Sequence, residues 1–68
     1  MEIEAKHMIA LETVIAGLKS ESRVVQTLSG SLPVGPLERA ALAKIADEIR
    51  YRAESIEALV RELKGESS

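Results

Sequence analysis

The sequence predicts an all-α fold: a single antiparallel two-helix hairpin over residues 1–68 that dimerises into a four-helix bundle. Three observations support this prediction. Apolar residues recur at heptad spacing in two long segments, one stretch rich in Gly and Pro separates these segments, and aliphatic residues supply almost all of the apolar content. Tyr51 is the only aromatic residue. Small and medium aliphatic side chains suit interdigitating helices.

The first helix is expected over about residues 3–28. Its apolar stripe occupies the a and d positions of a heptad repeat, which are the positions that face a neighbouring helix. The stripe consists of Met8, Leu11, Ile15, Leu18 and Val25, with Ser22 at the remaining a position. A second side has small residues, Ala10, Thr13, Gly17, Ser20 and Thr27, which indicate either a further close helix contact or exposed filler.

The turn is expected over about residues 29–35, where Gly and Pro cluster. Ser29 or Gly30 is predicted to end the first helix. Pro36 suits the first position of the second helix, because its missing N–H would have no partner there, and Gly35 serves as the N-cap.

The second helix is expected over about residues 36–64, with Gly65 as its C-terminal cap. Its a and d positions hold Leu42, Ile45, Ile49, Ile56, Leu59 and Leu63, with Arg52 at the remaining d position. On one flank, Ala46, Ala53 and Val60 widen this stripe. Ser22 and Arg52 are the polar residues within the two stripes, and we expect them to fix register or oligomeric state. Arg52 could reach Glu12, reach a carboxylate of a partner, or extend to solvent.

Val14 and Leu28 widen the stripe of the first helix in the same way, so both apolar stripes are wider than one neighbouring helix can cover. A chain of this length buries only about 60% of the surface of its unfolded state. The a and d residues of both helices are therefore also the predicted oligomer interface, with a homodimer as the simplest closure. A higher oligomer or an obligate partner protein would also cover the stripes.

A second candidate surface lies at the turn, because residues 24–37 have no charged side chain. Its apolar residues either fold back to cap the bundle or form a patch that docks another protein. These residues are Val24, Leu28, Leu32, Val34 and Leu37.

The sequence predicts no catalytic, cofactor-binding or metal-binding residues. Glu4 and His7 have the Glu-x-x-His spacing of di-iron bundles, but they fall at a helix end, and surface side chains are the simpler interpretation. Ser22 lies about 22 Å along the helix from His7, the only possible imidazole base. The absence of Cys excludes disulfides and fits a reducing compartment. The acidic start and the lack of a long apolar segment predict a cytoplasmic protein without a membrane span.

The expected function is therefore non-enzymatic: a helical hairpin that oligomerises and binds another protein, as a small regulator, adaptor or assembly subunit. The alternative is a nucleic-acid regulator of the Rop type, a hairpin that dimerises into a four-helix bundle and binds paired RNA loops. That parallel is one of architecture only. Nucleic acid is the less favoured partner, because the net charge is −2 and acidic residues interleave with the basic ones.

Overall fold

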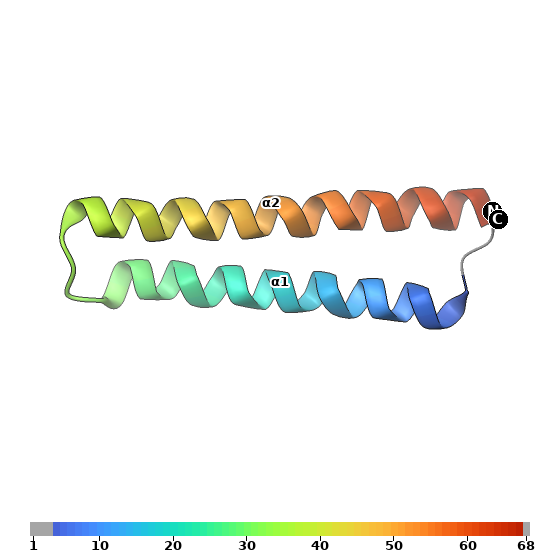
Figure 1. Cartoon of the computed structure of the whole chain (residues 1–68), viewed down its shortest axis with the longest axis horizontal. Helices are drawn as coiled ribbons and strands as arrows, with labels where there is room; N and C mark the ends of the chain where they lie inside the picture. The colour runs from blue at the N-terminus through green and yellow to red at the C-terminus, as the bar shows by residue number, and fades with distance from the viewer. Residues whose placement is uncertain (1–3, 68) are drawn as a thin grey trace.

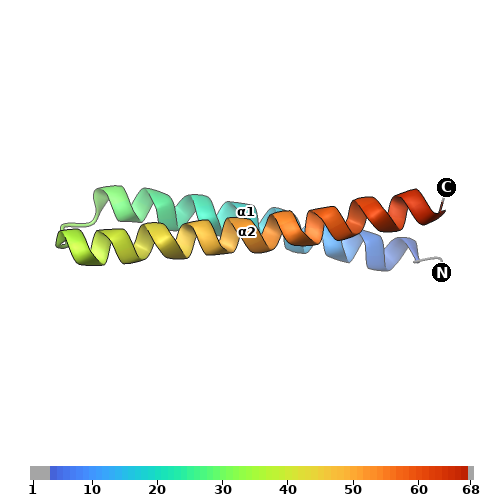
Figure 2. The ribbon, with the colours of Figure 1, turned by 90° about the horizontal axis from the view of Figure 1, so that it is seen from above.

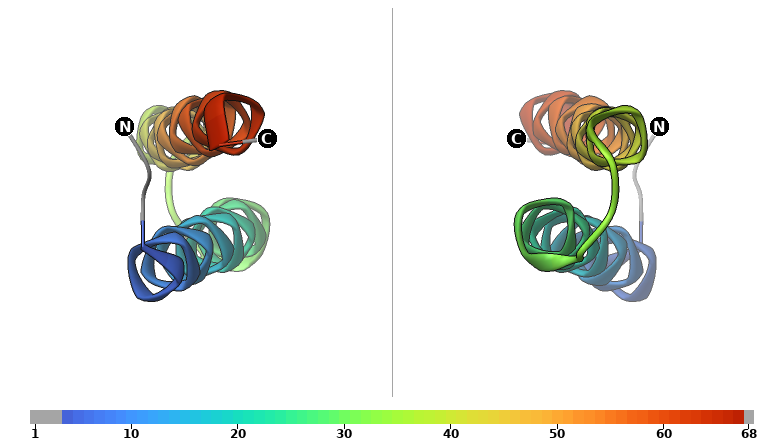
Figure 3. Two further views of the ribbon diagram at one scale, coloured as in Figure 1. Left: turned by 90° about the vertical axis from the view of Figure 1, so that its right-hand side faces the viewer. Right: turned by 90° about the vertical axis from the view of Figure 1, so that its left-hand side faces the viewer.

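The computed structural model describes residues 4–67 and confirms the helical hairpin (Figure 1). Helix α1 spans Ala5–Ser31, and helix α2 spans Pro36–Ser67. The helices are antiparallel and form a thin rod of 49 × 16 × 11 Å, which Figure 2 shows from above. Seen along the rod in Figure 3, one helix lies against the other, so each has a single neighbour within the described chain.

Helix α1 begins at Ala5, where Glu4 is extended at the N-cap with φ −68° and ψ 148°. The Glu4 carbonyl oxygen accepts hydrogen bonds from the backbone N–H groups of His7 and Met8, at 3.0 and 3.1 Å. These bonds satisfy two of the N–H groups that a helix start leaves without an intrahelical partner. The expected start near residue 3 lies outside the described residues.

Helix α1 ends at Ser31, so the prediction that Ser29 or Gly30 ends it is wrong. Leu32 leaves the helix with φ −72° and ψ 140°, and its N–H still donates to the Leu28 carbonyl at 2.9 Å. The physical reason is Pro33, since the ring of a proline disfavours helical backbone in the residue before it. Gly30 lowers helix propensity without ending the helix.

We predict that Gly30→Ala stabilises the hairpin by about 0.5–1 kcal/mol, because Ala favours a helix interior over Gly by that amount. A Cβ at Gly30 would meet no other atom within 4 Å, and no described glycine has a positive φ. Thermal unfolding followed by circular dichroism measures the change as a raised Tm. A lowered Tm would mean instead that Gly30 needs a left-handed conformation, as a glycine cap would.

Helix α2 starts as the sequence predicts, with Pro36 at its first position. The Gly35 carbonyl accepts a hydrogen bond from the Arg39 N–H at 3.0 Å. The Glu38 side chain folds back over Gly35, where an added Cβ would lie 2.6 Å from Glu38 Oε2. At the other end α2 continues to Ser67, so the predicted cap at Gly65 is wrong. Among the described residues no proline follows Gly65 to stop the helix, and glycine alone only weakens it.

The helices meet along a seam of residues that are buried or half-buried, at alternating spacings of three and four. In α1 the seam is the predicted a/d stripe, but in α2 it is rotated toward one flank. Ala46, Ala53 and Val60 are buried there, whereas Ile45, Arg52 and Leu59 are exposed. The seam consists of Met8, Leu11, Ile15, Leu18, Ser22, Val25 and Ser29 in α1, and of Leu42, Ala46, Ile49, Ala53, Ile56, Val60 and Leu63 in α2.

Small side chains explain this rotation of α2. Ala46 is 2% exposed and Ala53 is fully buried, and they share the seam with Ser22 and Ser29, which are also buried. Ala and Ser let two helix backbones approach more closely than Ile and Leu would, and a close approach improves the packing of the whole seam. The bulkier aliphatic residues of α2 at positions 45 and 59 are left at the margin.

Candidate functional site

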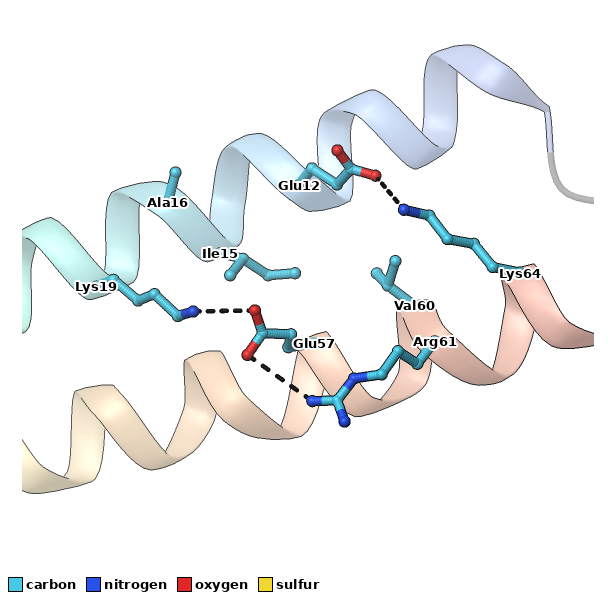
Figure 4. A pocket seen from close by; sticks show the side chains of 8 residues that line it. All are labelled: Glu12, Ile15, Ala16, Lys19, Glu57, Val60, Arg61 and Lys64. Carbon is cyan, nitrogen blue, oxygen red and sulfur yellow. Dashed lines mark hydrogen bonds and ion pairs between the residues drawn. The ribbon is translucent and has the colours of Figure 1, made fainter.

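The seam leaves the hairpin with two edges of different chemistry, and these edges are the candidate functional surfaces. The charged edge is defined by three residues of each helix, spaced seven apart. Two ion pairs cross the seam here: Lys19 Nζ lies 2.9 Å from Glu57 Oε2, and Lys64 Nζ lies 3.0 Å from Glu12 Oε1 (Figure 4). The charged edge comprises Glu12, Lys19, Gln26, Arg50, Glu57 and Lys64.

A shallow groove runs along the charged edge, between the two ion pairs. Ile15 and Val60 of the seam line it together with these charged side chains (Figure 4). The Lys19 side chain hydrogen-bonds to Glu57 and lies close to it as a positive charge, and together these effects lower the pKa of the Glu57 carboxyl. Partial burial opposes this lowering of the pKa, and Arg61, 4.0 Å away, adds to it. Glu57 is therefore held as a carboxylate that pairs with cations.

Most basic residues of this side are matched by carboxylates within the chain. Arg50 Nη2 lies 3.0 Å from Asp47 Oδ1, and Arg61 Nη2 lies 4.0 Å from Glu57 Oε1, four residues earlier in the same helix. Together with the two ion pairs across the seam, these contacts give this edge alternating positive and negative charges, and not a continuous basic stripe. Binding of a phosphate backbone requires a net positive patch, so this edge is poorly suited to nucleic acid.

Glu4 and His7 do not come together as ligands in the structure. The Glu4 carboxylate lies 3.4 Å from Lys6 Nζ, and the two residues of the motif are linked through the backbone bond at the start of α1. Both side chains are exposed. Among the side chains that the structure describes, no group of three or more His, Cys, Asp or Glu residues is placed so that it could hold a metal ion.

Ser22 is the polar contact within the seam. Its Oγ donates a hydrogen bond of 2.7 Å to the backbone carbonyl of Ala46 across the helix pair. By contrast, the hydroxyls of Thr13, Thr27 and Ser55 bond back to the carbonyl four residues earlier in their own helix. A buried side-chain hydrogen bond contributes about 1 kcal/mol and has a fixed geometry. The bond ties Ser22 to one position on α2, and a role for Ser22 in fixing register or oligomeric state stays a prediction.

Arg52 does not lie near Glu12, the carboxylate on α1 that the sequence suggests as its partner. Glu12 belongs to the charged edge and pairs with Lys64, so of the alternatives for Arg52 the structure shows the extension to solvent and not the contact with Glu12. The reason is the rotation of α2, which turns position 52 to the flank opposite Lys64. Arg52 is exposed there, between Ile45 and Leu59 along the helix.

The apolar edge is the flank of the seam opposite the charged edge. In each helix it consists of three residues spaced seven apart, with a charged residue in the middle and one aliphatic residue on each side of it. All six side chains are exposed, the four aliphatic ones by 40–48%. The sequence contains this repeat, but the division into two edges was missed because the a/d assignment placed Ile45 and Leu59 in the seam. The apolar edge comprises Val14, Glu21, Leu28, Ile45, Arg52 and Leu59.

The residues predicted for a partner patch are spread around the loop end of the hairpin. They lie in the last turns of α1, the loop and the first turn of α2, and whether they cap the bundle or dock a partner stays a prediction. Leu37 is 83% exposed, and Leu32 is also exposed. Val34 is half-buried in a shallow depression beside Pro36 and Ala40. Val24 is exposed, and Leu28 is shared with the apolar edge.

Neither described helix combines the length and the apolar content that a membrane span requires. Comparisons with protein-family models, with curated proteins and with solved structures find no match for this chain.

Proposed function

We propose that this chain is a non-enzymatic helical hairpin that self-associates and acts through protein–protein interaction, as a small regulator, adaptor or assembly subunit. The observation that supports the proposal is the imbalance between buried and exposed aliphatic surface. Among the described residues, five hydrophobic side chains are buried, and two of these are alanines. Nine large hydrophobic side chains are at least 37% exposed. Apolar surface on this scale is typical of interaction surfaces.

Because the core is small, the single hairpin is expected to have a low free energy of unfolding. A single seam of mostly small residues buries little apolar area, and domains of this size gain only about 3–5 kcal/mol from one core. A second copy that covers the exposed aliphatic residues adds apolar burial worth about 25 cal/mol per Å². Association with a second copy is therefore the simplest source of additional stability, and a dimer of hairpins makes a four-helix bundle.

Sedimentation velocity over a range of micromolar concentrations tests the proposal. We expect the chain to sediment as a dimer or a larger oligomer, with helix content that falls on dilution because folding and association are linked. A stably helical monomer at every concentration would contradict self-association. Gel retardation with structured RNA at low salt tests the Rop-type alternative, for which we expect no binding because the basic residues of the charged edge are matched by carboxylates. A cytoplasmic location stays a prediction from the sequence.

A further inference from the structure

Building on the proposed self-association, we infer that the apolar edge is the surface that binds a second copy of the chain, with the two loops at the same end of the dimer. The placement of this edge follows from the ion pairs. Glu57 and Lys64 contact α1 on one flank of the α2 seam. Ile45, Arg52 and Leu59 lie on the other flank of that seam. Val14, Glu21 and Leu28 are likewise on the far flank of α1, so the two sets share one edge of the hairpin.

The apolar edge is organised in three layers along the rod. The helices are antiparallel, and Glu12 pairs with Lys64 and Lys19 with Glu57 on the charged edge. These pairs fix which residues of α1 and α2 lie at the same height along the rod, and therefore also the order of residues on the apolar edge. The outer layers are aliphatic and the middle layer is charged. Val14 lies at the level of Leu59, Glu21 at the level of Arg52, and Leu28 at the level of Ile45.

The middle layer selects one of the two two-fold arrangements that bring this edge against itself. An axis parallel to the rod places α1 against α2 of the second copy. Arg52 then faces Glu21 of the partner subunit, and the reciprocal pair forms by symmetry. An axis across the rod places each helix against its own copy, so Glu21 would face the partner's Glu21 and Arg52 the partner's Arg52. Like charges in direct opposition destabilise an interface.

The outer layers fit the same arrangement. With the axis parallel to the rod, Val14 meets Leu59 of the partner subunit, and Leu28 meets Ile45 of the partner subunit. Each of these four side chains is 40–48% exposed in the single hairpin, so the contact removes aliphatic surface from water at both ends of the interface. Gly17, next to this edge, has nothing within 4 Å of the place where a Cβ would stand, which leaves room for a neighbouring helix. The central charges then specify register, as polar residues do in helical bundles.

Two charge-reversal variants test the edge. Glu21→Arg and Arg52→Glu each place like charges in opposition in the homodimer. We expect each to raise the dimer Kd at least tenfold, and an equimolar mixture of the two to associate with wild-type affinity, because the mixed dimer restores both opposite-charge pairs. Both side chains are exposed, and circular dichroism checks helicity. If a variant unfolds when it dissociates, an increase of helix content on mixing the two variants would show in the same way that the mixed dimer forms. Arg39→Glu, at an exposed position outside the apolar edge, is the control and should leave the Kd unchanged.

A distance measurement tests the orientation. The chain has no Cys, so Leu37→Cys gives a single labelling site near the loop, at a residue 83% exposed. In the dimer, electron–electron distance measurements between nitroxide labels should show a separation below about 30 Å, because paired helices lie about 8–10 Å apart. A separation near the 49 Å length of the rod would overturn the parallel axis.

The outcomes separate this inference from the proposed function. If neither charge reversal changes the dimer Kd, or if the loops lie at opposite ends of the dimer, the inferred interface is wrong. The proposal that the chain self-associates is not affected by either result. A chain that is monomeric at every concentration contradicts both. Charge-dependent dimerisation with a short loop-to-loop distance supports both.

Discussion

Replacing Ile15 with Asp is expected to unfold the hairpin, whereas the same replacement at Ile9 leaves it folded. Ile15 is 7% exposed and lies in the seam, where it lines the groove beside Val60 (Figure 4). Loss of its side-chain contacts and transfer of a carboxylate from water into the seam cost about 3 kcal/mol, which is comparable to the whole stability of a domain this size. Ile9 is 65% exposed, so an Asp there stays in water.

Urea unfolding followed by far-ultraviolet circular dichroism measures both Asp variants. Tyrosine fluorescence would report little, because Tyr51 is the only aromatic residue and is 70% exposed. The comparison is matched, since Ile9 and Ile15 are the same residue type in the same helix. Equal loss of helix in the two variants would contradict the described position of the seam.

The second large effect is expected from Ala53→Leu, which adds three carbon atoms at a position with no exposure. Overpacking at such a site forces side chains and backbone apart, and it costs about 1–3 kcal/mol. Ala58→Leu is the control, because Ala58 is exposed on the same helix and Leu has nearly the helix propensity of Ala. We expect a lowered urea midpoint for Ala53→Leu and little change for Ala58→Leu.

The Ala53 variant also distinguishes between the two possible faces of α2. If the seam ran through Ile45 and Leu59, as the heptad assignment predicts, position 53 would lie on its flank. Leu at position 53 would then add apolar contact and raise the midpoint. A raised midpoint would therefore contradict the described rotation of α2.

For helix α1, the sequence was sufficient to predict which residues face the other helix. The a/d stripe predicted for the first helix, from Met8 to Val25, is the same set of residues that α1 contributes to the seam over that range. Ser22 interrupts this stripe, as predicted. A stripe on one helix follows from the spacing of apolar residues alone, because side chains three and four positions apart share a face. The apolar residues of α1 leave little choice of face.

On α2 the sequence allowed two faces, and it could not decide between them. Ile45 and Leu59 are larger and more apolar than Ala46 and Ala53, so periodicity favours the face with the larger residues. The choice depends on how closely the backbones approach, and this depends on both helices at once. Ser22, whose Oγ reaches the Ala46 carbonyl at 2.7 Å, is part of that close approach.

The sequence by itself determined that this protein is a two-helix hairpin. Heptad spacing and one Gly/Pro-rich break are local signals, and local signals are enough to place helices and the turn between them. Only the tertiary structure decided which residues of α2 face α1, and therefore that one edge is charged and the other has aliphatic residues around Glu21 and Arg52. The physical reason is that a seam is chosen by the mutual packing of two surfaces, and no pattern within a single helix contains that information.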